Sequence, residues 1–181
     1  MSDLRLALDK EALKSSRERY SLTFAGPAGE KALIGYDLPG LLKYADWVNV
    51  QSLDFYVLWE NEYENFTGPI SPLYHHAPKG FSDKFNVHWA IKTYVCKLKS
   101  PKQVVMGIPL YGRSWQNVPE KSGEYAIYRR SIAGKKLTEG DIVYWRDIKR
   151  DWLSNSKFKK YFDDKVKASY IYSSGDGTLL R

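Results

Sequence analysis

Three carboxylate residues alternate with other residues in the first half of the chain. Glu60, Glu62 and Glu64 would share one face of an extended segment, and two carboxyl groups on one face can act as an acid–base pair. Such a pair needs apolar surroundings that raise the pKa of one member, whereas this segment has the composition of a solvated loop. We therefore favour a solvated loop over a catalytic pair.

Metal and redox chemistry have little support in the sequence. His75 and His76 are adjacent and have no third ligand at a useful spacing, so we interpret them as loop residues. Cys96 is the only cysteine, which excludes an internal disulfide and a cysteine-based metal site. Asn65-Phe66-Thr67 is a glycosylation sequon that matters only in a secreted chain. The sequence predicts no metal centre and no cofactor.

The composition indicates a folded domain and argues against two classes of partner. Of the 181 residues, 43% are hydrophobic and 15% aromatic, which is enough to bury a core. No apolar run reaches the roughly 20 residues of a membrane span. The net charge is +7, but aspartates interrupt the densest basic stretch, 146–167, as is typical of a solvated face. We predict no nucleic-acid partner and no membrane partner.

Hydrophobic periodicity predicts alternating helices and strands up to residue 108. Leu4, Leu8 and Ala12 recur at a spacing of four and predict an amphipathic helix over 4–13. Pro39 suits the first turn of a short helix, and apolar spacing predicts a longer helix over 86–98. Three β-rich runs are predicted as strands: 20–25, 47–54 and 104–108. This order indicates parallel strands joined by crossover helices, an α/β fold.

The pattern changes after Tyr111. Glycines separate short aromatic or β-branched runs there, and one helix is predicted over 147–162. We predict two domains, an α/β segment over 1–115 and a small α+β segment over 116–181.

Three separated segments carry a resemblance to a known family: residues 35–49 (GYDLPGLLKYADWVN), 67–74 (TGPISPLY) and 106–115 (MGIPLYGRSW). In order, they resemble the run into the sixth strand, the loop after it and the seventh strand of glycoside hydrolase family 18. This family contains the chitinase and chitinase-like (β/α)8 barrels. The resemblance implies a partial TIM barrel of about three parallel strands with helices, beginning at the helix after the fourth strand. Part of the family's insertion domain would follow. A complete barrel needs about 250 residues.

The resemblance also implies the identity of one site residue. Asp54 matches the family's sixth-strand Asp, which helps to orient the N-acetyl group of the substrate. The Tyr position before it is occupied by Leu53, which has no hydrogen-bond donor, and the neighbouring Met position by Gln51. The family's alternating Asp run that ends in the catalytic Glu, and its eighth-strand Trp, do not occur in this sequence. We assign no catalytic residue, and whether the chain is an enzyme stays open.

Three further residues match family positions at the sugar cleft. Tyr111 and Arg113 are expected at the carboxyl end of the seventh strand, and Trp59 is expected in the loop after the sixth. Arginine donors suit hydroxyl and acetamide groups, and aromatic rings cover pyranose faces. The alternative is that Tyr111 and Arg113 only brace the insertion domain and that Trp59 packs within its loop. We predict that Asp54, Trp59, Tyr111 and Arg113 bind chitin or chito-oligosaccharide.

The resemblance and the substitutions together predict a chitinase-like domain that binds N-acetylglucosamine polymers without independent hydrolysis. One alternative is part of an active chitinase that hydrolyses the β-1,4 linkages of chitin with a Glu outside this sequence. Another is a basic interaction module unrelated to sugar. Three parallel strands without barrel closure have two unpaired edges, so self-association or pairing with the missing barrel half is expected. An extracellular location is suggested by the resemblance alone.

Overall fold

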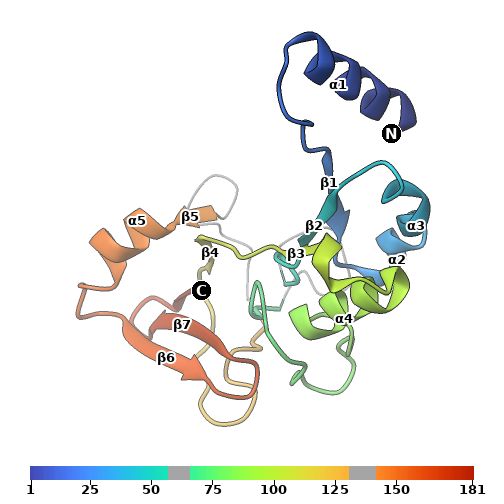
Figure 1. The fold of residues 1–181 in the computed structure, drawn as a ribbon. Helices are drawn as coiled ribbons and strands as arrows, with labels where there is room; N and C mark the ends of the chain where they lie inside the picture. The colour runs from blue at the N-terminus through green and yellow to red at the C-terminus, as the bar shows by residue number, and fades with distance from the viewer. Residues whose placement is uncertain (57–65, 131–141) are drawn as a thin grey trace. The chain divides into compact units, whose positions relative to one another are not determined.

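The computed structural model describes residues 1–56, 66–130 and 142–181. The chain divides into two compact units, and Figure 1 labels their helices α1–α5 and strands β1–β7. The first unit comprises Met1–Ser52 and Trp89–Gly107, and the second comprises Leu53–His88 and Ile108–Arg181. The predicted domain boundary after residue 115 stays a prediction.

Three parallel strands form the sheet of the first unit, in the order β1-β2-β3 (Figure 1). They are β1 (Thr23–Pro27), β2 (Trp47–Gln51) and β3 (Val104–Met106). Helices α2 (Glu30–Leu33) and α3 (Leu38–Leu41) connect β1 to β2. Helix α4 (Val87–Leu98) and the 3₁₀ turn η1 (Pro101–Gln103) precede β3. The predicted α/β class with three parallel strands is confirmed.

The central strand β2 explains the core of this unit. Val48 and Val50, two residues apart on one face of β2, are fully buried. Tyr94 of α4 is also buried, and its hydroxyl donates to the Pro27 carbonyl at 2.9 Å. Gly26 of β1 permits this contact, because a Cβ atom there would lie 2.3 Å from the Tyr94 hydroxyl oxygen. Helix α4 and strand β1 therefore approach closely at Gly26, because glycine has no side chain.

Helix α1 (Ser2–Lys14) confirms the predicted first helix; of its predicted apolar face Ala12 is buried and Leu8 is half-buried, but Leu4 is exposed. Leu4, the first residue of the predicted apolar face, is 50% exposed, and Leu13 is 82% exposed. Arg5 is buried as well, and its Nη2 lies 2.7 Å from Asp9 Oδ1 and its Nη1 3.5 Å from Asp46 Oδ2. Helix α1 therefore buries an ion-paired arginine together with Ala12 and not a row of leucines.

The second unit contains a five-stranded antiparallel sheet in the order β5-β4-β8-β7-β6. The strands are β4 (Tyr111–Trp115), β5 (Ile142–Tyr144), β6 (Lys159–Asp163), β7 (Ala168–Ser173) and β8 (Thr178–Leu180). Alternate residues supply two apolar clusters: Trp115 and Leu179 belong to one, and Ile171 and Leu180 to the other. The sheet is thus packed on both faces.

The predicted helix over 147–162 is wrong. Its first part is helical, in the short helix α5 (Trp145–Asp147) and the π-helical turn η2 (Ile148–Trp152). A turn at Asn155 follows, whose side-chain oxygen accepts from the Lys157 amide at 3.0 Å. The last part is strand β6, because Tyr161 pairs with Tyr170 of β7 and their rings stack at 4.9 Å. A long-range strand pairing overrides the local helical pattern.

No helix within the described ranges is both long and apolar enough to cross a membrane.

Candidate functional site

The second unit brings together three of the four predicted site residues. Tyr111 and Arg113 lie two residues apart on β4, so their side chains share one face of the sheet. Both residues follow β3, which ends at Met106, and their strand β4 belongs to the antiparallel sheet; their expected place at the carboxyl end of the seventh strand stays a prediction. Asp54 comes from the segment that begins the second unit and meets both side chains.

The Asp54 carboxylate is the centre of this group, which we call the Asp54 cluster: Asp54, Tyr111 and Arg113. The Tyr111 hydroxyl donates to Oδ2 at 2.7 Å. Arg113 Nε donates to Oδ1 at 3.0 Å, and its Nη2 lies 3.0 Å from the same oxygen. The side chains of Asp54 and Arg113 are 16% and 9% exposed, so this ion pair is shielded from water and is stronger than a surface pair.

The backbone at Asp54 is unusual and explains how its side chain reaches β4. Its φ is +57°, in the left-handed region, which aspartate tolerates better than most residues. The next amide, that of Phe55, donates to the Ile70 carbonyl at 3.0 Å, which fixes the chain just after the turn. Residues held in sparsely populated backbone regions cluster at ligand sites, where neighbouring structure enforces them.

The electrostatics keep Tyr111 as a proton donor. Burial, followed by the hydrogen bond to Asp54, raises the pKa of Tyr111 to about 12. The phenol therefore stays protonated at neutral pH. A carboxylate accepts hydrogen bonds at both oxygens, so Asp54 can also accept an N–H or O–H from a ligand at Oδ2. Next to it, Leu53 offers only an apolar side chain. The arrangement suits recognition of a polar, uncharged ligand.

Three buried arginines of the second unit are accommodated in different ways. Arg113 pairs with a carboxylate, as described. Arg129 donates to the carbonyls of Ala126, Pro119 and Lys121, and its guanidinium lies 4.2 Å from the centre of the Tyr172 ring. Arg181 lies over Trp115, 3.7 Å from its ring centre, and its guanidinium nitrogens have no hydrogen-bond partner among the described residues. Burial lowers the pKa of Arg181 well below its ordinary value.

The remaining sequence candidates do not join the Asp54 cluster. Trp59 and the alternating Glu60, Glu62 and Glu64 lie outside the described residues. His76 stacks on Tyr125 with ring centres 5.0 Å apart, and its Nε2 lies 3.4 Å from Glu124 Oε1. Within the described residues, no group of three or more His, Cys, Asp or Glu side chains could hold a metal ion.

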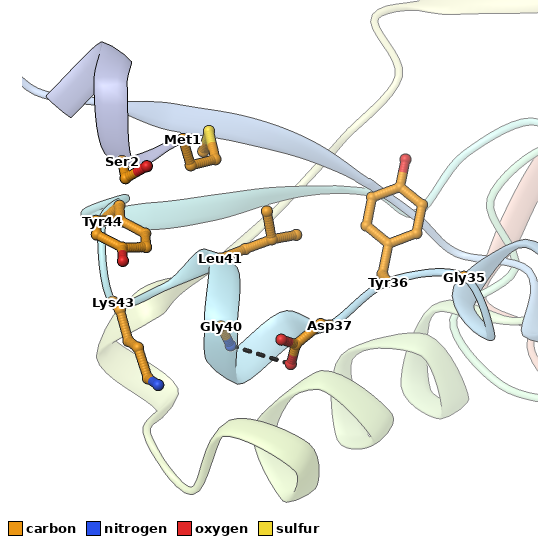
Figure 2. A pocket seen from close by; sticks show the side chains of 9 residues that line it. All are labelled: Met1, Ser2, Gly35, Tyr36, Asp37, Gly40, Leu41, Lys43 and Tyr44. Carbon is orange, nitrogen blue, oxygen red and sulfur yellow. Dashed lines mark hydrogen bonds between the residues drawn. The ribbon is translucent and has the colours of Figure 1, made fainter.

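An open groove of about 620 Å³ lies in the first unit and is a weaker candidate. Figure 2 shows its lining, in which the Asp37 carboxylate bonds back to the Gly40 amide at 3.1 Å. This bond caps helix α3, whose second residue is Pro39, as the sequence predicted. Asp37 therefore has a structural explanation, and no group of polar side chains comparable to the Asp54 cluster lines this groove.

Sequence reasoning missed the mutual contacts of the site residues and the role of Arg181. The alternation of Tyr111 and Arg113 in a β-rich run was the available signal for a shared face. No local signal identifies Arg181 as buried, because its position depends on pairing with the distant Arg113, whose amide donates to the Arg181 carbonyl at 2.6 Å.

The profile of the family described as Glycosyl hydrolases family 18 matches residues 1–180. The chain belongs to this family. The human protein Chitinase-3-like protein 2 is 35% identical over 172 residues, which are 91% of this chain and 42% of that protein. The predicted family is confirmed.

Solved structures of the family confirm the fold. An immunomodulatory active chitinase from Trichuris suis matches with a TM-score of 0.81 and 25% identity, over 99% of this chain and 48% of that one. A family 18 chitinase from Cycas revoluta, solved in complex with (GlcNAc)3, matches with a TM-score of 0.77 and 25% identity, again over 99% and 48%. The chain spans about half the length of these relatives. Its fold is that of part of a family 18 TIM barrel with an α+β segment.

Proposed function

We propose that this family 18 domain binds N-acetylglucosamine polymers at the Asp54 cluster and does not hydrolyse them by itself. The observation that carries the proposal is the shielded hydrogen-bonded group of Asp54, Tyr111 and Arg113. It presents a carboxylate oxygen, a fixed guanidinium and an aromatic ring on one face. These are the groups that bind hydroxyls, an acetamide and a pyranose face.

The ligand class follows from the relatives and from the chemistry of the cluster. The Cycas revoluta chitinase was solved with (GlcNAc)3, and this chain has the same fold over 99% of its length. Because Arg113 is already neutralised by Asp54, the cluster carries no net charge. It therefore favours a neutral sugar over an anion, and an N-acetylated sugar supplies both an N–H donor for Asp54 and a carbonyl acceptor for a guanidinium.

The absence of independent hydrolysis is proposed from the position before Asp54. Glycoside cleavage needs a proton donor and a group that stabilises the developing charge. Where the family resemblance places a Tyr donor, this chain has Leu53. Losing one such donor typically lowers the rate about a hundredfold or more. Asp54 itself accepts hydrogen bonds from Tyr111 and Arg113, so in this arrangement it serves as an acceptor.

Calorimetric titration with (GlcNAc)4, with reducing ends measured in the same sample, tests the proposal. We expect saturable binding without release of reducing ends. Asp54→Asn should weaken binding about tenfold, because a charged hydrogen-bond partner contributes about 1.5–3 kcal/mol and 1.4 kcal/mol is tenfold in affinity. The matched control is Asp164→Asn, at a side chain that is 79% exposed and should leave binding unchanged.

The other outcomes identify the alternatives. Release of reducing ends would show an active chitinase and refute the second half of the proposal. Equal affinities of Asp54→Asn and the control would mean that sugar binds elsewhere. If (GlcNAc)4 does not bind at all, the Asp54 cluster is structural. Polyanion binding that falls steeply with added salt would then support a basic interaction module.

A further inference from the structure

The second unit contains a groove of about 420 Å³ that none of the Asp54 cluster residues lines. Among the described residues, its lining comes from His76, from the turn 123–126 and from the hairpin of β6 and β7 (Figure 1). These residues lie between positions 76 and 170, so neither end of the sequence belongs to the lining. We call this groove the Tyr161 groove, after the exposed ring that lines it.

Tyr161 is a fixed aromatic platform in this groove. It lies opposite Tyr170 of β7, and the two rings stack with their centres 4.9 Å and their planes 10° apart. Tyr170 is buried, whereas Tyr161 is 38% exposed. Tyr170 therefore covers one face of the Tyr161 ring, and the rest of the ring is open to the groove. A side chain that is already held in place loses little conformational freedom when a ligand stacks on it.

A second aromatic ring lines the groove from the turn 123–126. The Tyr125 ring stacks on His76 with ring centres 5.0 Å apart. His76 Nε2 in turn lies 3.4 Å from Glu124 Oε1, which is a carboxylate of the same turn. The ring of Tyr125 is thus held from behind in the same way as the ring of Tyr161. The groove has aromatic surface on two of these three segments.

Asp163 provides a fixed hydrogen-bond acceptor next to the platform. It follows Tyr161 by two residues on β6, so both side chains lie on one face of the strand, about 6.6 Å apart along it. Asp163 Oδ1 accepts from the main-chain amides of Lys165 and Val166 at 2.9 and 3.3 Å. Its Oδ2 has no hydrogen-bond partner among the described residues, and a carboxylate oxygen can accept from a ligand.

The charges of the groove largely balance. Glu124 lies beside His76. Asp164 pairs with Lys167, and Lys165 also lines the groove. A cationic ligand therefore has little advantage over a neutral one. Aromatic surface beside a carboxylate acceptor suits a neutral ligand that has a flat C–H face and O–H donors at its edge, as a pyranose has.

We propose that the Tyr161 groove is a carbohydrate site, separate from the Asp54 cluster, for β-1,4-linked pyranose chains of glucose configuration. One sugar ring stacks on Tyr161, and one of its hydroxyls donates to Asp163 Oδ2. The ring substituents of such sugars are equatorial, so both ring faces consist of C–H groups that can cover an aromatic ring. Because these contacts use a ring face and a hydroxyl, the groove requires no N-acetyl group. The inference therefore does not rest on sugar binding at the Asp54 cluster.

The probe is cellotetraose, which has the β-1,4 linkage and no acetamide. Amide chemical shifts of the ¹⁵N-labelled full chain are followed during titration. With one platform and one charged acceptor the site is weak, and we expect a Kd of about 1 mM. Saturable shifts are expected at Tyr125, Tyr161 and Asp163, with cellotetraose and also with (GlcNAc)4. Sorbitol has the same kind of hydroxyls but no ring, so it should shift none of these amides.

Two matched variants test the platform. Tyr161→Val removes the ring but keeps a residue of high β-propensity, and it should weaken binding about tenfold or more, which is at least about 1.4 kcal/mol. Tyr161→Phe keeps the ring and should bind cellotetraose like the parent chain. Equal affinities of these two variants would exclude stacking on this ring.

A second pair of variants tests the acceptor. Asp163→Asn can keep Oδ1 as the acceptor of the Lys165 and Val166 amides, but its amide group replaces the carboxylate oxygen Oδ2. It should weaken cellotetraose binding about tenfold, because a charged hydrogen-bond partner is lost. The control is Asp151→Asn, which makes the same change of charge in the second unit outside the groove. Equal affinities of the two variants would contradict the assigned contact.

Three other results would overturn the proposal. One is the absence of saturable shifts at Tyr161 and Asp163 with cellotetraose. Another is a response to (GlcNAc)4 alone, which would show that the groove requires an acetamide. The third is a stronger response of the same amides to tetralysine, which would identify a groove for basic peptides. Saturable cellotetraose shifts at these amides support the site whether or not (GlcNAc)4 binds at the Asp54 cluster.

Discussion

Replacing Tyr111 by Phe isolates one contact of the Asp54 cluster. The change removes the hydroxyl that donates to Asp54 Oδ2 at 2.7 Å and keeps the ring. A hydrogen bond to a charged group contributes about 1.5–3 kcal/mol to stability. Since Asp54 keeps Arg113 as a partner and is 16% exposed, we expect the lower value, about 1.5 kcal/mol.

Urea unfolding followed by tryptophan fluorescence measures this difference, because Trp115 is buried in the same unit. The control is Tyr144→Phe. Tyr144 lies opposite Tyr111 on β5 but is 58% exposed, so its hydroxyl should contribute within about 0.5 kcal/mol. A double-mutant cycle with Asp54→Asn then measures the interaction energy between Asp54 and Tyr111. If Tyr111→Phe destabilises no more than Tyr144→Phe, or the two sites do not couple, the hydrogen bond does not hold the cluster together.

Three further predictions concern pH and packing. The pKa of Tyr111 is raised to about 12, so the hydroxyl contributes its full stabilisation of the folded state below about pH 10 and loses it as the pH rises toward 12. The difference in unfolding free energy between the parent chain and Tyr111→Phe should therefore shrink in urea titrations at alkaline pH. Gly26→Ala should destabilise the fold by about 1–3 kcal/mol, because the new Cβ atom would overlap Tyr94, whereas Gly29→Ala, with nothing within 4 Å of its Cβ position, should not. Equal shifts of the melting temperature in the two variants would contradict the close approach at Gly26. Thr67→Val should destabilise the fold by about 1–3 kcal/mol, because the buried Thr67 hydroxyl donates to the Ile127 carbonyl at 2.7 Å and accepts from the Arg129 amide at 2.9 Å. Thr67→Ser keeps the hydroxyl and should retain most of the stability in the same thermal melts.

Periodicity predicted the elements whose burial it determines. The helix over 86–98 and the strand over 47–54 appear as α4 and β2, each with buried apolar residues, and the strand over 104–108 appears as β3, which pairs with β2. Periodicity gave wrong predictions where contacts between residues distant in the sequence determine the structure. The β6 residues have a local helical pattern but pair with β7, and Leu4 of α1 is exposed while Arg5 is buried beside Asp9 and Asp46.

The candidate site was predictable as a set of residues but not as a geometry. Family resemblance and residue type selected Asp54, Tyr111 and Arg113. Neither indicated that the three side chains bond to one another, because Asp54 is more than 50 positions distant from β4 in the sequence. The unpaired edges expected for three parallel strands concern β1 and β3, the outer strands of the parallel sheet.

The left-handed backbone of Asp54 implies a trade-off between local conformation and chemistry. Glycine would adopt a φ of +57° freely, whereas a residue with a Cβ atom is destabilised there by about 1 kcal/mol. Glycine would also remove the acceptor that holds Tyr111 and Arg113. Asparagine tolerates the same backbone but keeps only one acceptor oxygen, so Asp54→Asn removes the charge and one acceptor without backbone strain, while Asp54→Ala would add that strain. At this position the carboxylate occurs at the expense of conformational ease, which agrees with the proposed binding role of the Asp54 cluster.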